Sequence, residues 1–141
     1  MSKNILIGNI EFTSDLKQIN SDMLTGFFDG WNNPPDKTKL LKLLKNSAFV
    51  VLAIDNGKVI GFINAISDKV LSTYIPLLEV LKEYQGKGIG SELVRRMLEQ
   101  LKDFYMIDVI CDEDLQKFYE KCGFVKHTAM IKRNYDKQNG I

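Results

Sequence analysis

A segment with three alternating glycines is the part of this chain best suited to binding chemistry: Gln85-Gly86-Lys87-Gly88-Ile89-Gly90-Ser91. Glycine allows the backbone to approach a ligand closely, and the start of a helix presents unpartnered N–H groups that carry partial positive charge. Together these features form an anion site, best suited to a phosphate or pyrophosphate. A connector that only turns the chain is the plainer alternative, and three glycines in six residues speak against it.

Two known phosphate-binding patterns fit this segment incompletely. A P-loop requires a lysine after its glycines, whereas Lys87 lies among them. A dinucleotide-binding fingerprint requires a third glycine where Ser91 stands, although Asp108 follows about twenty residues later, where a ribose-binding acid is expected. That fingerprint normally follows the first strand of a repeated βαβ unit, and here several elements precede the glycines. A dinucleotide-binding module therefore stays an alternative.

The elements that must position the glycine segment follow from the hydrophobic period. A strand is expected over about 73–81, and its Pro76 indicates a sheet edge or a bulge because proline has no N–H to donate. A helix follows the glycines, with apolar residues on one face and Glu92, Arg95, Arg96, Glu99 and Lys102 mostly on the other. A further strand covers 105–111. Asp112 can then cap a short helix that Gly123 ends.

The flanking regions complete a mixed α/β pattern. Two β-branched runs, 48–54 and 59–66, enclose Asn56-Gly57 and predict a tight hairpin. Before them we expect a strand in the first eleven residues and a helix starting at Ser14-Asp15. A second helix is expected from Asp36 or Thr38 to Asn46. A last β region is expected from Phe124 to about Tyr135.

Composition limits the classes of function. The chain has 141 residues, which fits one domain over 1–141, and 45% apolar with 26% charged residues is ordinary for a globular protein. A net charge of +1 argues against non-specific binding to nucleic acid or to an anionic membrane. The single histidine, His127, and the lack of a C-x-x-C pair leave little to bind a metal. Two cysteines, Cys111 and Cys122, favour a cytoplasmic location.

Two motifs resemble a known family, the GNAT (GCN5-related) N-acetyltransferases. Residues 85–90 match every specified position of its acetyl-CoA signature, Q/R-x-x-G-x-G/A, between a strand and an amphipathic helix. Residues 115–124 resemble its later helix, which ends in a Tyr-Glu-Lys-x-Gly-Phe run. The resemblance implies an α/β (α+β) fold with about six or seven strands and about four helices. It also implies an acetyl-CoA cleft between two splayed parallel strands, 73–81 and 105–111.

The resemblance also implies how acetyl-CoA is held. The backbone N–H groups from Gln85 to Ser91 would bind the pyrophosphate. Leu78 and Val80 would line the pantetheine and acetyl group, and an N–H near Val80 would polarise the thioester carbonyl. Phe118 belongs to the same set. Many relatives carry Asn where this chain has Asp112, so its contact with CoA is an expectation only.

Two side chains are the implied catalytic groups. An amine nucleophile has a pKa of about 10.4 and must lose a proton before it attacks. Glu79 is the expected base, acting through a water molecule, and the plainer alternative is a glutamate on the opposite face of the strand. Tyr119 is the expected acid that protonates the thiolate leaving group, and the plainer alternative is an aromatic ring that only packs.

The sequence thus predicts an N-acetyltransferase that uses acetyl-CoA, without a metal, to acetylate a primary amine of a small molecule or peptide. A non-catalytic module that binds or senses acyl-CoA is the main alternative. The expected partners are the amine acceptor and, if the chain is not a monomer, a second copy in a homodimer. Neither nucleic acid nor a membrane is expected.

Overall fold

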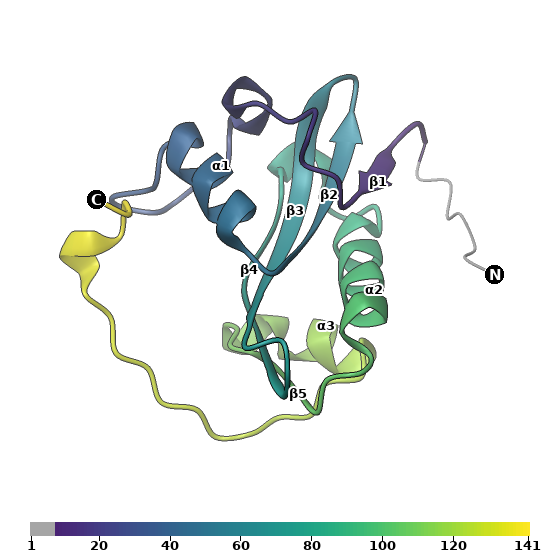
Figure 1. The fold of residues 1–141 in the computed structure, drawn as a ribbon, viewed down its shortest axis with the longest axis vertical. Helices are drawn as coiled ribbons and strands as arrows, with labels where there is room; N and C mark the ends of the chain where they lie inside the picture. Colours follow the sequence, from purple (N-terminus) through teal and green to yellow (C-terminus); the bar gives the residue numbers. More distant parts are fainter. Residues whose placement is uncertain (1–7) are drawn as a thin grey trace.

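The computed structural model describes residues 8–141, and a mixed five-stranded sheet lies at its centre. The strands follow the order β1-β2-β3-β4-β5, with bounds Glu11–Thr13, Phe49–Asp55, Lys58–Ser67, Ser72–Val80 and Met106–Val109. Within these residues the helices are α1 (Lys37–Asn46), α2 (Ile89–Leu101) and α3 (Gln116–Lys121), with short 3-10 helices η1 (Ser21–Leu24), η2 (Lys82–Tyr84), η3 (Glu113–Leu115) and η4 (Tyr135–Lys137). Helices α1 and α2 cover opposite faces of the sheet (Figure 1).

The hairpin predicted around Asn56-Gly57 is confirmed and organises the sheet. Both turn residues have positive φ, 49° at Asn56 and 74° at Gly57, as a tight hairpin turn requires. Strands β2 and β3 pair antiparallel on either side of it, β1 adds antiparallel to β2, and β4 adds antiparallel to β3. Only β4 and β5 run parallel, which makes the sheet mixed.

Pro76 lies at a β-bulge, as its lack of an N–H predicts. The register between β3 and β4 shifts between Asn64 and Ile66, so that Ile75 and Pro76 share one position opposite Ala65. The parallel ladder to β5 runs from Ser72 to Ile75 and stops there, whereas β4 continues to Val80. The two parallel strands therefore separate at Pro76, as the splayed pair requires.

Alternation along the strands separates two apolar cores. Leu78 and Val80 face the core beneath α2, while Leu77 faces the core beneath α1. The first core is built around Ile63, Leu93 and Met97, and the second around Leu44, Leu52 and Phe62. Residues that follow one another in β4 thus serve different faces of the sheet.

The helix predicted from Ser14-Asp15 is wrong. Asp15 accepts a hydrogen bond from the Lys17 N–H at 2.9 Å in a local turn, and Asn20 caps only the one-turn helix η1. These short polar side chains compete with helical hydrogen bonds for backbone N–H groups. The second predicted helix is confirmed as α1, capped by Asp36. Of the expected opening strand, residues 5–7 lie outside the described residues, and β1 begins later, at Glu11.

The β region predicted from Phe124 to Tyr135 is also wrong, which lowers the strand count below six or seven. Residues 125–134, here called the arch, form neither strand nor helix, and every one of them is exposed. In Figure 1 this yellow-green stretch extends away from the body of the molecule between α3 and the C-terminus. A strand exists only when its backbone groups find a partner. In the part of the chain that is described, residues 125–133 have no backbone hydrogen-bond partner, and Asn134 only accepts from the nearby Lys137 N–H.

Within residues 8–141, no helix combines the length and the apolar content needed to cross a bilayer.

Candidate active site

The glycine segment leaves the N-terminus of α2 open. Gly88 is the N-cap residue with φ 85°, a left-handed conformation that suits glycine, and it has no side chain to cap the helix. The first helical hydrogen bond runs from the Glu92 N–H to the Gly88 carbonyl oxygen at 3.1 Å. The N–H groups of Ile89, Gly90 and Ser91 therefore have no partner inside the helix. A Cβ added at Gly86 or Gly88 would meet no atom within 4 Å, so the space before the helix is open.

The part of β4 beyond Pro76 presents backbone groups toward β5. The Leu81 N–H donates to Ile60 of the β3 side at 2.8 Å, and N–H directions alternate along a strand. The N–H groups of Val80 and Leu78 consequently point away from β3, into the space where β5 no longer pairs. The Gln85 side chain donates to the Val80 carbonyl oxygen at 2.9 Å and ties the glycine segment to the end of the strand.

Three of the predicted cofactor-binding residues meet at one place. A Cβ on Gly90 would lie 3.7 Å from the Phe118 ring and 3.9 Å from the Val80 side chain. The glycine thus allows α2, α3 and β4 to approach one another closely. The predicted pyrophosphate and pantetheine regions are contiguous here. Lys87 extends over the Tyr84 ring, with Nζ 5.5 Å from the ring centroid.

Tyr119 lies at the centre of an aromatic cluster in α3. Its ring packs edge-on against Phe118 at 5.0 Å and against Phe124 at 5.6 Å, and the residue is 7% exposed. Burial, with smaller contributions from Cys111 and Cys122, raises the pKa of the Tyr119 phenol to about 12. The hydroxyl therefore keeps its proton across the physiological range. A packing role for the Tyr119 ring is therefore compatible with an acid role for its hydroxyl, because the ring packs while the hydroxyl stays protonated.

Glu79 lies on the other face of β4 and is held by a loop. Its Oε1 accepts a hydrogen bond from the Phe28 N–H at 2.7 Å, and Phe28 itself has positive φ, 65°. Burial raises the pKa of the Glu79 carboxyl, and backbone hydrogen bonds from Phe28 and Asp29 act in the opposite direction. Glu79 therefore has two properties at once. Its carboxyl has a raised pKa, which suits a general base, and its hydrogen bond to Phe28 anchors the loop before α1.

Asp112 does not cap the following helix with its side chain. It precedes η3, and only its backbone carbonyl accepts a hydrogen bond, from the Leu115 N–H at 3.0 Å. The expectation of a side-chain cap is therefore wrong, and the exposed carboxylate is free of that role. A groove of about 430 Å³ lies between α2 and the end of α3, lined by Ser91, Val94, Arg95, Leu98, Glu99, Lys121 and Cys122. It begins at the glycine segment.

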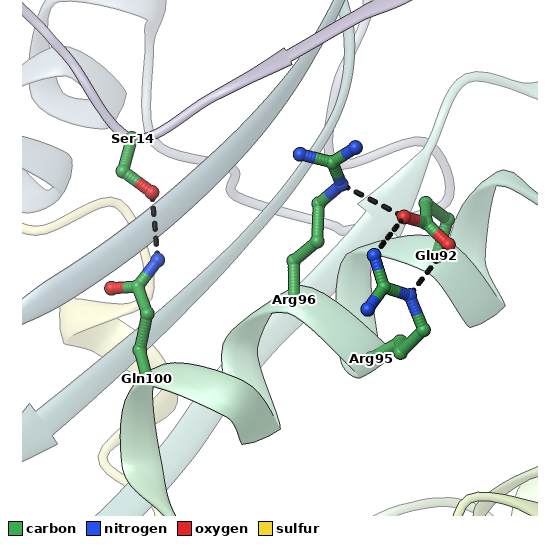
Figure 2. Close-up of polar contacts among 5 residues, drawn as sticks. All are labelled: Ser14, Glu92, Arg95, Arg96 and Gln100. Atoms are coloured by element: carbon green, nitrogen blue, oxygen red, sulfur yellow. Dashed lines mark hydrogen bonds and ion pairs between the residues drawn. The ribbon is translucent and has the colours of Figure 1, made fainter. Parts of the chain in front are cut away.

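Sequence reasoning missed a charged cluster on α2. Glu92 was expected on the exposed face, but its side chain is 1% exposed and pairs with Arg95 at 2.7 Å and with Arg96 at 2.8 Å (Figure 2). The spacings of three and four residues are a signal that could have found it. Hydrogen bonds from Arg95 and then Arg96 lower the pKa of the Glu92 carboxyl against the effect of burial. The same figure shows Gln100 reaching Ser14 near β1, at 2.7 Å.

The contact between Glu79 and Phe28 was missed for a different reason. It joins residues 51 positions apart through a backbone N–H, which carries no sequence signal of its own. The described residues also contain no group of three His, Cys, Asp or Glu side chains arranged to hold a metal ion.

Comparison with known proteins gives a consistent result. The family model described as "Acetyltransferase (GNAT) family" matches residues 16–124. A solved structure, assigned as an acetyltransferase from Deinococcus radiodurans R1, is 46% identical and superposes with a TM-score of 0.93, covering 96% of this chain and 95% of that one. An uncharacterized N-acetyltransferase from Pyropia yezoensis is 30% identical over 86% of this chain and 74% of its own length. A third relative, GCN5-related N-acetyltransferase 3, chloroplastic, from Arabidopsis thaliana, is 35% identical over 79% of this chain, which spans 46% of it.

Proposed function

The chain belongs to the GNAT acetyltransferase family, and on that premise we propose that it transfers the acetyl group of acetyl-CoA to a primary amine of a small molecule or peptide. One observation carries the proposal. The uncapped N-terminus of α2 lies next to the stretch of β4 whose N–H groups face away from β3. An anion site and an open strand edge thus adjoin, as a ligand with a pyrophosphate and an amide-containing arm requires.

The residues present fit acetyl-CoA. The N–H groups of residues 89–91 suit a pyrophosphate, because they combine free donors with the positive end of a 13-residue helix. The pantetheine amides suit the open edge of β4, where Leu78 and Val80 offer backbone groups and apolar side chains. Asp112 and Phe118 lie at the α3 end of the same region.

The attacking amine must be neutral, because an ammonium ion has no free electron pair. In the proposed reaction the amine nitrogen attacks the thioester carbon, an N–C bond forms and the C–S bond breaks. The Val80 N–H donates to the carbonyl oxygen as negative charge develops there. Glu79 accepts the proton lost by the amine, through a water molecule, and its raised pKa supports that role.

Tyr119 is the proposed acid, and its hydroxyl donates a hydrogen bond to the departing sulfur, which takes up its proton from solvent. A thiol has a pKa of about 8.5, so the thiolate can also leave before it is fully protonated. Because the pKa of Tyr119 is about 12, its hydroxyl assists mainly by donating a hydrogen bond as the C–S bond breaks. Losing that hydroxyl should therefore slow the reaction without abolishing it.

A thiol-release assay with a panel of primary amines tests the proposal. We expect CoA release on at least one acceptor. We expect Tyr119→Phe to lower kcat by about 10- to 100-fold, which is at or below the low end of the range of about 100- to 10,000-fold for general acid–base catalysis, because the hydroxyl mainly donates a hydrogen bond. The Kd for acetyl-CoA should stay the same, since the ring remains packed. Tyr135→Phe, which removes an exposed hydroxyl elsewhere, is the matched control. Acetyl-CoA binding without release on any acceptor would support a sensing module instead.

Glu79→Gln separates the two properties of Glu79. The amide oxygen can still accept the Phe28 N–H, but the side chain can no longer accept a proton. If Glu79 is the base, kcat falls by about 100-fold while the melting temperature is kept. Glu79→Ala should lower both. An unchanged kcat for Glu79→Gln would reduce Glu79 to an anchor of the loop.

Location and acceptor choice complete the proposal. The free thiols of Cys111 and Cys122 favour a cytoplasmic location. We also propose that the loop held by Glu79 selects the acceptor, since Phe28 packs there against Trp31 in a tilted arrangement with ring centroids 4.7 Å apart.

A further inference from the structure

A hydrogen bond that the proposed reaction does not use joins the β2–β3 hairpin turn to the glycine segment. The Tyr84 hydroxyl donates to Oδ2 of Asp55 at 2.7 Å, between residues 29 positions apart. Asp55 ends β2 directly before the turn, and Tyr84 ends η2 directly before Gln85. The turn that organises the sheet therefore also holds the chain that leads into α2.

Tyr84 is held at its backbone, its ring and its hydroxyl. Its N–H donates to the Leu81 carbonyl oxygen at 2.8 Å, and its half-buried ring packs against the core beneath α2. The hydrogen bond to Asp55 raises the pKa of the Tyr84 phenol, so the hydroxyl keeps its proton and remains a donor. The ring therefore has a fixed place at the start of the glycine segment.

The glycine segment depends on contacts outside itself for a defined conformation. Gly86 and Gly88 both have positive φ, and glycine gives the backbone more conformational freedom than any other residue. Lys87 lies between them, and its Nζ is 5.5 Å from the centroid of the Tyr84 ring, an arrangement in which the ring face attracts the ammonium. Tyr84 thus restrains the segment through the chain before it and through the side chain at its centre.

We propose that Tyr84 and Asp55 are positioning residues for the cofactor, through which the hairpin turn holds the glycine segment in the conformation that leaves the N–H groups of residues 89–91 open to a pyrophosphate. The inference rests on the proposed function, which supplies that pyrophosphate as part of acetyl-CoA. A segment that is ordered before binding loses less conformational freedom when the ligand arrives. The pair should therefore strengthen binding of the phosphate end of the cofactor without changing the chemical step.

Tyr84→Phe removes the hydroxyl and keeps the ring beneath Lys87. We expect it to raise the Kd for CoA, measured by isothermal titration calorimetry, by about 10-fold, which corresponds to one hydrogen bond to a charged group. Asp55→Ala should raise the Kd equally, and the double variant no further, because both changes remove the same bond. Asp55→Asn keeps an acceptor oxygen and should stay within about 3-fold of the unmodified chain. Tyr135→Phe, which removes an exposed hydroxyl elsewhere, is the matched control.

A truncated cosubstrate separates positioning from a general loss of structure. S-acetylpantetheine has the thioester but no pyrophosphate, so Tyr84→Phe should leave its kcat/KM unchanged while kcat/KM for acetyl-CoA falls by about 10-fold and kcat is kept. An unchanged Kd for CoA in Tyr84→Phe, or an equal loss with both cosubstrates, would overturn the positioning proposal. CoA binding without transfer to any amine would overturn the proposed function alone, because the Kd comparison still holds. An unmodified chain that binds no CoA would overturn both.

Discussion

The two long helices of this molecule begin in opposite ways. At α1, the Asp36 carboxylate accepts the Lys39 N–H at 2.8 Å, so the chain satisfies its own helix start. At α2, Gly88 has no side chain to do so, and the first N–H groups stay open. A capped start adds stability and closes the anion site, whereas an uncapped start gives up stability and keeps the site free. The difference distinguishes a structural helix from the helix that we propose binds the cofactor.

The first turns of the two helices differ as well. The first turn of α1 contains no acidic residue, while that of α2 contains Glu92. A carboxylate in that position would compete with a bound anion for the positive end of the helix. Arg95 and Arg96 instead hold Glu92 within the protein, where its charge is neutralised. The open helix start is thus kept free of both side-chain caps and unpaired negative charge.

Placing a carboxylate at the open helix start should have the largest effect. We expect Gly88→Asp to weaken acetyl-CoA binding by at least about 100-fold, because the added charge lies within a few ångströms of the phosphates in partly screened surroundings. Isothermal titration calorimetry measures the change. Gly88→Asn has the same shape without the charge and should weaken binding by less than about 10-fold, since Asn tolerates positive φ.

A matched control separates strain from position. Gly57 also has positive φ, 74°, with nothing within 4 Å of an added Cβ, but it lies in the β2–β3 turn. Gly57→Asp should therefore show the same backbone strain and leave acetyl-CoA binding unchanged. Equal binding by the Gly88→Asp and Gly88→Asn variants would contradict the assignment of α2 as the anion site.

Removing the charge of Glu92 should have an intermediate effect, on stability alone. We expect Glu92→Gln to lower the free energy of unfolding by about 2 kcal/mol. This is less than a fully buried charge cluster would lose, because both arginines are partly exposed. The lowered pKa in the folded state means that this contribution is complete above the ordinary value of 4.5 and is lost as pH falls through the folded pKa. Denaturant titrations at several pH values should therefore show a shallower acid loss in the variant. A weaker affinity for acetyl-CoA would assign Glu92 to the binding site instead.

Removing the cap of α1 should have the smallest effect. Asp36→Ala is expected to lower the free energy of unfolding by about 1 kcal/mol, the usual value for an N-cap, and to leave acetyl-CoA affinity unchanged. Thermal melts and calorimetry on the same samples measure both quantities. Asp36→Asn should restore most of the stability because Asn also caps well. A change in affinity would end the distinction between the two helix starts.

Much of the fold was predictable because its signals are local. Asn56-Gly57 defines the hairpin turn, Asp36 marks the start of α1, and Pro76 indicates the bulge where β4 and β5 separate. Where a local signal competed with another, the prediction failed. Ser14-Asp15 looks like the start of a helix, but the Asp15 side chain closes a local turn instead. Residues 125–133, where the sequence predicts a β region, have no backbone hydrogen-bond partner within the described chain.

The sequence by itself determined that a glycine-rich turn leads into an amphipathic helix, and from this it predicts an anion site. These properties depend on the conformational range of each residue and its near neighbours. Only the tertiary structure decided how the groups around that segment are placed. The direction of the Val80 N–H depends on pairing with β3, the hold on Glu79 depends on Phe28, and the burial of Glu92 depends on two arginines. Such contacts arise when distant segments pack, and packing energy depends on both partners at once.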